Sequence, residues 1–73
     1  MNASRTAELF EAFAARSLDD AREIGKQLAA QGGFKLMADE IDRLEEDTGD
    51  VRVAAWISRR WAGIEYARGR FWA

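Results

Sequence analysis

The side chains best suited to molecular recognition are concentrated in the last third of the chain, residues 51–73. This segment contains all three tryptophans, the single tyrosine and five arginines. Tryptophan, tyrosine and arginine are the residue types most enriched in the binding hot spots of protein interfaces. The sequence therefore predicts a protein that works by holding a partner. The members of this group are Arg52, Trp56, Arg59, Arg60, Trp61, Tyr66, Arg68, Arg70 and Trp72.

The remaining side chains argue against catalysis and metal binding. The chain has no cysteine and no histidine. It therefore offers no thiol nucleophile, imidazole base, Ser-His-Asp triad or thiolate zinc ligand. The carboxylates and lysines form no recognisable acid–base or nucleophile pair. We therefore expect a protein that is not an enzyme and that uses no cofactor.

The length of 73 residues allows one domain, spanning residues 1–73. A core of this size supplies about 3–5 kcal/mol of stability unless a disulfide, a metal or a partner subunit adds to it. Because cysteine and histidine are absent, a second copy of the chain is the remaining means of support. We expect a homodimer.

The sequence also indicates where the protein resides. No run of 18 apolar residues occurs, so no membrane-spanning helix is predicted. The first residues, Met1 to Arg5, are followed by alternating apolar and charged residues rather than by the apolar core of a signal peptide. The predicted location is the cytoplasm.

Composition predicts an all-α fold, a small bundle of three to four short helices completed by dimerisation. Proline is absent, and alanine, glutamate, arginine and leucine are common. The helices are expected at about 5–16, 18–31, 34–48 and 51–71. Ser4, Ser17 and Asp50 are candidate N-caps, with Asp20 three residues after Ser17. One continuous helix over 5–31 is the alternative for the first two.

Glycines and apolar spacing support these boundaries. Gly32-Gly33 and Gly49 interrupt the helical pattern, because glycine adopts the left-handed conformation that ends many helices. Apolar residues recur at helical spacing within each of the first three segments. These faces are Leu9, Phe10, Phe13 and Ala14; Ala21, Ile24, Leu28 and Ala29; and Phe34, Met37, Ile41 and Leu44.

A helical wheel divides residues 51–73 into two faces. An apolar stripe within an arc of about 100° is typical of a core-facing side. It comprises Val53, Ala54, Ile57, Trp61, Ile64, Phe71 and Trp72. The other face is aromatic and basic, and it supplies the candidate protein-interaction residues Arg52, Trp56, Arg59, Arg60, Tyr66 and Arg70.

Two main interpretations of Trp56 stay open, and a contact with nucleic acid or a membrane surface is a third that the acidic remainder of the chain weakens. It lies off the apolar stripe, with Arg52 one turn before it and Arg60 one turn after it. Either the helix is buried on both sides and Trp56 belongs to the core, or Trp56 is a hot spot that contacts another protein. Arginine stacked on tryptophan is compatible with both.

Charge is distributed unevenly along the chain. Residues 1–50 carry six basic and twelve acidic side chains, whereas residues 51–73 carry five arginines and one acid. The acidic segment 34–48 lacks the calcium-loop pattern, and its negative charge disfavours a DNA-reading helix. A solvated acidic face is the simplest interpretation.

The expected function is a non-enzymatic protein-interaction module that binds and modulates, most simply inhibits, a larger protein. Small single-domain proteins of this kind are often encoded by phages and other mobile elements. The alternative is a nucleic-acid-associated regulator that uses the stripe Arg52, Arg59 and Arg70 on the basic C-terminal helix. Salt dependence separates the two, because phosphate contacts weaken steeply with salt.

Overall fold

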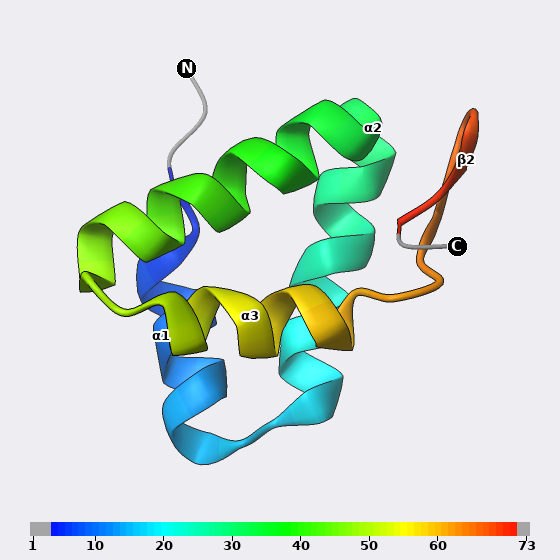
Figure 1. Ribbon diagram of the computed structural model, residues 1–73. Coiled ribbons are helices and arrows are strands. Elements are labelled where there is room, and N and C mark those ends of the chain that lie inside the picture. Colours follow the sequence, from blue (N-terminus) through cyan, green and yellow to red (C-terminus); the bar gives the residue numbers. More distant parts are fainter. Residues whose placement is uncertain (1–3, 72–73) are drawn as a thin grey trace.

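The computed structural model describes residues 4–71 and is mostly helical. Three helices precede a short antiparallel strand pair (Figure 1). They are α1 (Thr6–Ala15), α2 (Leu18–Thr48), α3 (Val51–Arg60), β1 (Glu65–Tyr66) and β2 (Gly69–Arg70). The predicted helical bundle is confirmed in outline. The predicted helix 51–71 is wrong beyond Arg60, where the chain leaves the helix and forms a hairpin.

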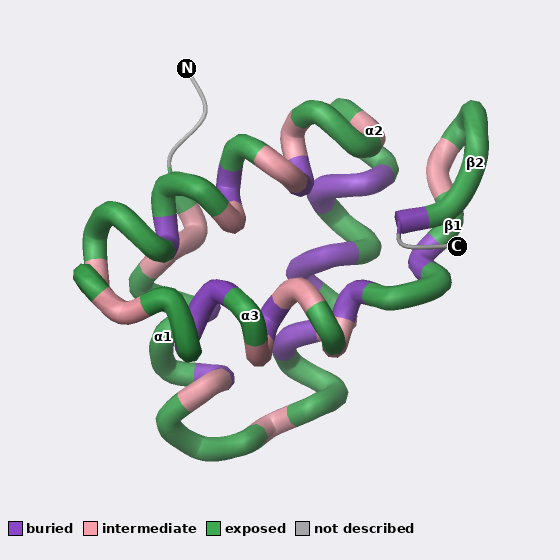
Figure 2. Tube along the Cα trace, viewed as in Figure 1, coloured by how far each residue is buried: buried purple, intermediate pink, exposed green. Residues whose placement is uncertain are grey.

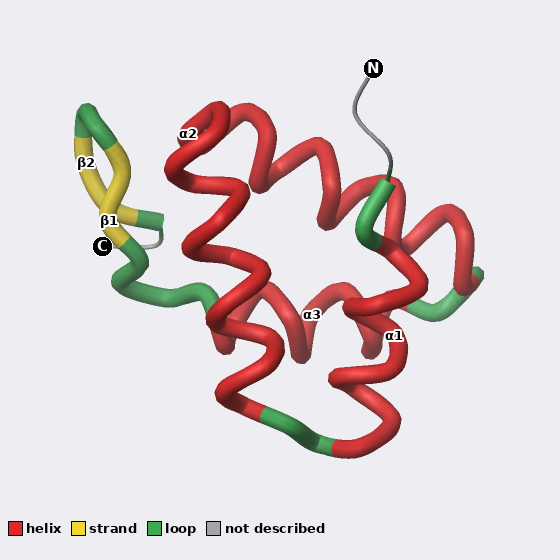
Figure 3. The backbone as a smooth tube through the Cα atoms, turned by 180° about the vertical axis from the view of Figure 1, so that it is seen from behind, coloured by secondary structure: helices red, strands yellow, loops and turns green. Residues whose placement is uncertain are grey.

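The first two helices are separate, as the Ser17 cap predicts, and a single helix over 5–31 is wrong. Arg16 ends α1 in the left-handed conformation, with φ 52°. The Ser17 side chain then accepts a hydrogen bond from the backbone N–H of Asp20 at 3.3 Å. The reversal between α1 and α2 is visible from behind in Figure 3.

The predicted break at Gly32-Gly33 is a sharp bend inside α2 rather than a gap between two helices. Gly33 has φ 65° and ψ −151°, values that only glycine adopts readily. Figure 1 shows the first half of α2 passing the end of α3 and the second half turning back above it. The bend lets one long element contact α1, α3 and β1.

The α2–α3 turn is built from the two residues predicted to form it. Gly49 has φ 65° and donates its N–H to the carbonyl of Glu45 at 2.8 Å. The Asp50 carboxylate accepts from the backbone N–H of Arg52 at 2.9 Å.

At the other end of α3, Arg22 Nη1 donates to the carbonyls of Arg60 and Ala62 at 2.6 and 3.0 Å. Arg22 thus places a positive charge at the negative end of the helix dipole.

The hairpin begins where Gly63 turns the chain with φ 82°. Its N–H donates to the carbonyl of Phe71 at 2.7 Å, and the Phe71 N–H donates to the carbonyl of Ile64 at 2.9 Å. Between these bonds and the hairpin turn, β1 and β2 pair in antiparallel fashion, with Glu65 opposite Arg70. This return of the chain carries Phe71 back to the core.

The core lies where the inner sides of the three helices meet the base of the hairpin (Figure 2). The apolar stripe predicted for the last segment is buried at every described position, but only its first part is helical. Trp72 lies outside the described residues. The buried apolar residues include Leu9, Ala12, Ala21, Ile24, Leu28, Ala29, Met37, Leu44, Val53, Ala54, Ile57, Trp61, Ile64 and Phe71.

Three predicted core positions are wrong, and each has a local cause. In α1, Leu9 and Ala12 point inward, which turns Phe10 and Ala14 toward solvent. Phe34 follows the bend at Gly33 and is 47% exposed. Phe13 and Ile41 are half-buried at the edge of the core. The displaced aromatic rings therefore lie on the surface.

The start of α1 is fixed by a buried carboxylate from α2. Glu40 is 5% exposed, and its Oε2 accepts from the backbone N–H of Arg5 at 2.8 Å. Arg5 occupies the N-cap position, so the prediction of Ser4 as N-cap is wrong by one residue. The Ser4 hydroxyl instead accepts from the N–H of Thr6 at 3.3 Å. Glu40 thus satisfies a backbone N–H at the half-buried start of α1.

Candidate protein-interaction surface

Four of the six predicted interaction residues lie together on α3. Arg52, Trp56, Arg59 and Arg60 line a shallow cavity of about 270 Å³, with Ala55 between them. Val53, Ala54 and Ile57 are buried on the opposite side of the helix. The helical spacing therefore leaves a basic face on α3, because the apolar face is committed to the core. We call Arg52, Ala55, Trp56, Arg59 and Arg60 the basic hollow.

Trp56 is half-buried at the boundary between the core and the surface. Its ring meets the ring of Phe13 edge-on, with 5.7 Å between the centroids. Phe13 in turn lies 6.3 Å from the ring of Phe10, which is 45% exposed. The three rings form a continuous line from α3 across α1 into solvent. We call Phe10, Phe13 and Trp56 the aromatic row.

An arginine stacks on each of two rings in the row. The guanidinium carbon of Arg16 lies 4.1 Å from the centre of the Phe13 ring. That of Arg60 lies 5.1 Å from the centre of the Trp56 ring. Both distances are within the range of cation–π attraction, which holds the cations beside the rings. The row therefore presents apolar area and fixed positive charge together.

The Arg60 side chain is held against the Trp56 ring and not by an ion pair with a carboxylate of residues 4–71. Its Nε is buried and has no hydrogen-bond partner among residues 4–71. Neither Arg59 nor Arg60 forms an ion pair within that part of the chain. A carboxylate on a partner would reach the exposed Arg59 guanidinium and form charge-assisted hydrogen bonds with it.

Arg52 differs because Asp50 already engages it. Its Nε and Nη2 donate to the two Asp50 carboxylate oxygens, each at 3.1 Å. Hydrogen bonding to the Arg52 side chain, and then to its backbone N–H, lowers the pKa of Asp50. The same pair raises the pKa of Arg52. Arg52 thus has a local role in starting α3 as well as a place in the basic hollow.

Tyr66 and Arg70 do not join the face on which the helical wheel placed them, because residues 61–71 are not helical. Both lie on the hairpin. The Tyr66 ring packs against the bend in α2, with 6.4 Å between its centroid and that of Phe34. A shallow apolar cavity of about 380 Å³ adjoins Tyr66, Phe34 and Gly33. The hairpin thus forms a second, separate surface.

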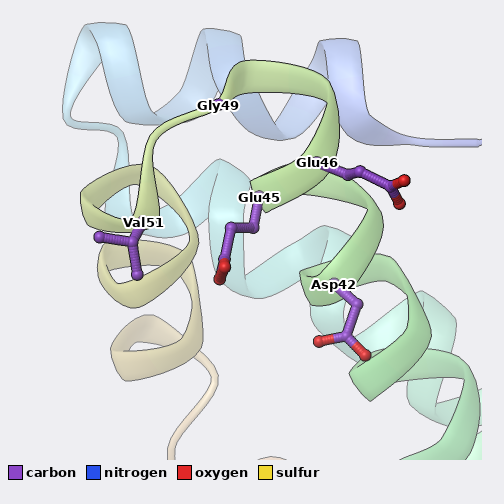
Figure 4. A pocket seen from close by; sticks show the side chains of 5 residues that line it. All are labelled: Asp42, Glu45, Glu46, Gly49 and Val51. Atoms are coloured by element: carbon purple, nitrogen blue, oxygen red, sulfur yellow. The ribbon is translucent and has the colours of Figure 1, made fainter.

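A third surface lies at the α2–α3 turn and is acidic. Asp42, Glu45 and Glu46 line a cavity of about 600 Å³ with Gly49 and Val51 (Figure 4). Figure 4 shows the three acidic side chains on the last turns of α2, with the Glu46 carboxylate pointing away from Val51. None of the three forms an ion pair within residues 4–71. No three acidic side chains in the described part are grouped to hold a metal ion. We call Asp42, Glu45, Glu46, Gly49 and Val51 the acidic corner.

Phe10 and Phe13 of the aromatic row, and Arg16, which stacks on Phe13, were not identified from the sequence. Helical spacing with Leu9 places the two phenylalanines in the core. A signal is present nonetheless. Ala12, three residues after Leu9, offers an alternative inward position at helical spacing.

Comparison of the chain with protein-family models, curated proteins and solved structures finds no match. Within residues 4–71, no helix is both long enough and apolar enough to cross a membrane.

Proposed function

We propose that this chain is a non-enzymatic protein-interaction module that binds a larger protein through the aromatic row and inhibits it by covering the bound surface. The observation that carries the proposal is the continuity of the row, which leads from half-buried Trp56 to exposed Phe10 across two helices. Contiguous exposed apolar surface is uncommon on monomers and typically marks interaction sites.

The row has the composition of a binding hot spot. Tryptophan and arginine are enriched in such sites, where their side chains are well packed. Phe13 packs against Trp56, and Arg16 and Arg60 flank the rings. The matching partner surface has an apolar pocket for Phe10 with carboxylates at its rim.

The proposal includes self-association as a homodimer, cytoplasmic residence and an origin in a phage or other mobile element. Self-association is supported by the small size of the core.

Substitution of Phe10 by aspartate tests the proposed surface. The charge at the exposed end of the row should abolish capture of the partner from a nuclease-treated host lysate, because an unpaired carboxylate would enter an apolar contact. Because Phe10 is 45% exposed and lies outside the buried core, the helical circular dichroism should stay unchanged. Affinity capture with immobilised protein, followed by mass spectrometry, is the measurement.

Leu18→Asp is the matched control, since Leu18 is 49% exposed on α2 and lies outside the row. It should capture the same protein as the wild type. Equal capture by Phe10→Asp and Leu18→Asp would refute the aromatic row as the contact surface.

A nucleic-acid-associated regulator is the second candidate. The observation in its favour is that Arg59, Arg60, Arg68 and Arg70 lie on α3 and the following hairpin without ion pairs within residues 4–71. Such a contact predicts binding to single-stranded DNA that falls steeply with salt. Capture that survives nuclease and moderate salt favours the protein partner.

A further inference from the structure

The basic α3 and the acidic corner carry opposite charges and meet at Val51, which begins α3 and lines the corner. Arg59 is exposed near the end of α3, whereas Val51, 62% exposed, lies at its start beside Glu45 and Glu46. Arg59 and the acids of the corner have no ion-pair partners within residues 4–71. If a second copy is rotated by 180° so that its α3 runs in the opposite direction, Arg59 of each copy comes near the acidic corner of the other.

The outward stripe of α3 suits close approach of a second helix. Arg52, Ala55 and Arg59 recur at intervals of three and four residues and are all exposed. Ala55, at the middle of this stripe, has a side chain small enough to let two helix axes come near the lower limit of ordinary packing distances. Arg52 and Arg59 lie toward the ends of the stripe. Their long side chains can extend along the facing helix there, so they do not hold the two helices apart.

We propose that two copies of this chain pair through antiparallel α3 helices that cross at Ala55. In that register each residue after Ala55 faces the residue equally far before it. Arg59 of one copy then lies over Val51 of the other copy, beside its acidic corner. A two-fold axis generates this contact twice, as in most homodimers.

The proposal rests on the homodimer included in the proposed function and assigns its interface. Isolated charges at the rim of an interface contribute little, but opposed charges fix register and exclude like-charge alternatives. The parallel arrangement places Arg59 beside Arg59 of the other copy, whereas the antiparallel one places Arg59 near Arg52, whose charge the Asp50 carboxylate already offsets. The exposed Val51 becomes covered in the antiparallel pair.

Charge reversal tests the register. The purified 73-residue chain at about 100 µM should sediment at twice the chain mass of 8.2 kDa if its dissociation constant is micromolar. Arg59→Glu alone and Glu45→Arg alone should each weaken dimerisation by about tenfold or more, because each places like charges together twice. Lys26→Glu is the control, an equal charge change on the exposed side of α2, and it should leave the dimer intact.

The decisive sample is a mixture of the two single variants. In the mixed dimer the introduced carboxylate at position 59 faces the introduced guanidinium at position 45 at one contact. At the other contact the native Arg59 faces the native Glu45, so dimerisation should be restored to near the wild-type value. A monomeric wild type overturns the proposal, and so does a dimer that neither reversal weakens or that mixing fails to restore. These results leave capture through Phe10 unaffected, so the interface and the aromatic row can fail independently.

Discussion

Trp61→Ala should leave the chain largely unfolded at 25 °C. Trp61 is 0% exposed, meets Phe71 edge-on with 5.8 Å between centroids, and donates its Nε1–H to the carbonyl of Ala21 at 2.8 Å. Loss of a buried tryptophan typically costs about 3–5 kcal/mol. That is the whole stability expected of a core this small. Circular dichroism at 222 nm with urea titration is the measurement.

Trp56→Ala is the matched control for this experiment, because it removes the same side chain from a half-buried position. It should lower the free energy of unfolding by a smaller amount and leave the chain folded. Unfolding by both variants would make Trp56 a core residue and remove the main support for the aromatic row. A folded Trp61→Ala variant would show that the hairpin is not held by the core as described.

Gly25→Ala should destabilise the fold, although the same change usually stabilises an exposed helix by about 1 kcal/mol. A Cβ at this position would lie 2.6 Å from Cδ1 and Nε1 of Trp61 and 2.8 Å from Cδ1 of Ile64. Overpacking of this kind typically costs about 1–3 kcal/mol because the indole must move. Thermal melting of the variant and the wild type measures the difference.

The neighbouring Lys26→Ala is the control for Gly25→Ala. Lys26 is exposed in the same turn of α2, so its replacement should change stability by less than about 0.5 kcal/mol. If Gly25→Ala melts at or above the wild-type temperature, the close approach of Trp61 to α2 is incorrect.

The parts of the fold that could be predicted from sequence are those with local causes. The Ser17 and Asp50 caps and the bend at Gly33 follow from hydrogen bonding or backbone freedom within a few residues. The inward faces of the first half of α2 and of α3 follow from helical spacing. These features do not depend on distant segments.

The hairpin could not be predicted in the same way, because its cause is a long-range contact. Ile64 and Phe71 fit a helical stripe with Ile57 as well as they fit paired positions of a hairpin. The hairpin is favoured over the helix because it lets the Phe71 ring pack against the rings of Trp61 and Phe34. The local sequence signals that the helix ends were Gly63, which adopts a positive φ, and Gly69 in the hairpin.

The candidate site was predicted in part. Trp56 and its arginine neighbours on α3 lie together because ten residues of true helix connect them. Tyr66 and Arg70 are separated from them by the end of that helix. Phe10 and Phe13 are added by the packing of α1 against α3, which spacing within one segment cannot reveal.

Photo-crosslinking from position 10 tests the central claim, that the aromatic row contacts another protein, most directly. Phe10 is replaced by benzoylphenylalanine, and the same probe at exposed Asp19 on α2 is the comparison. In nuclease-treated host lysate we expect a crosslinked protein from position 10 alone, diminished by excess unlabelled wild type. No crosslink from position 10, or equal crosslinking from both positions, would contradict the account.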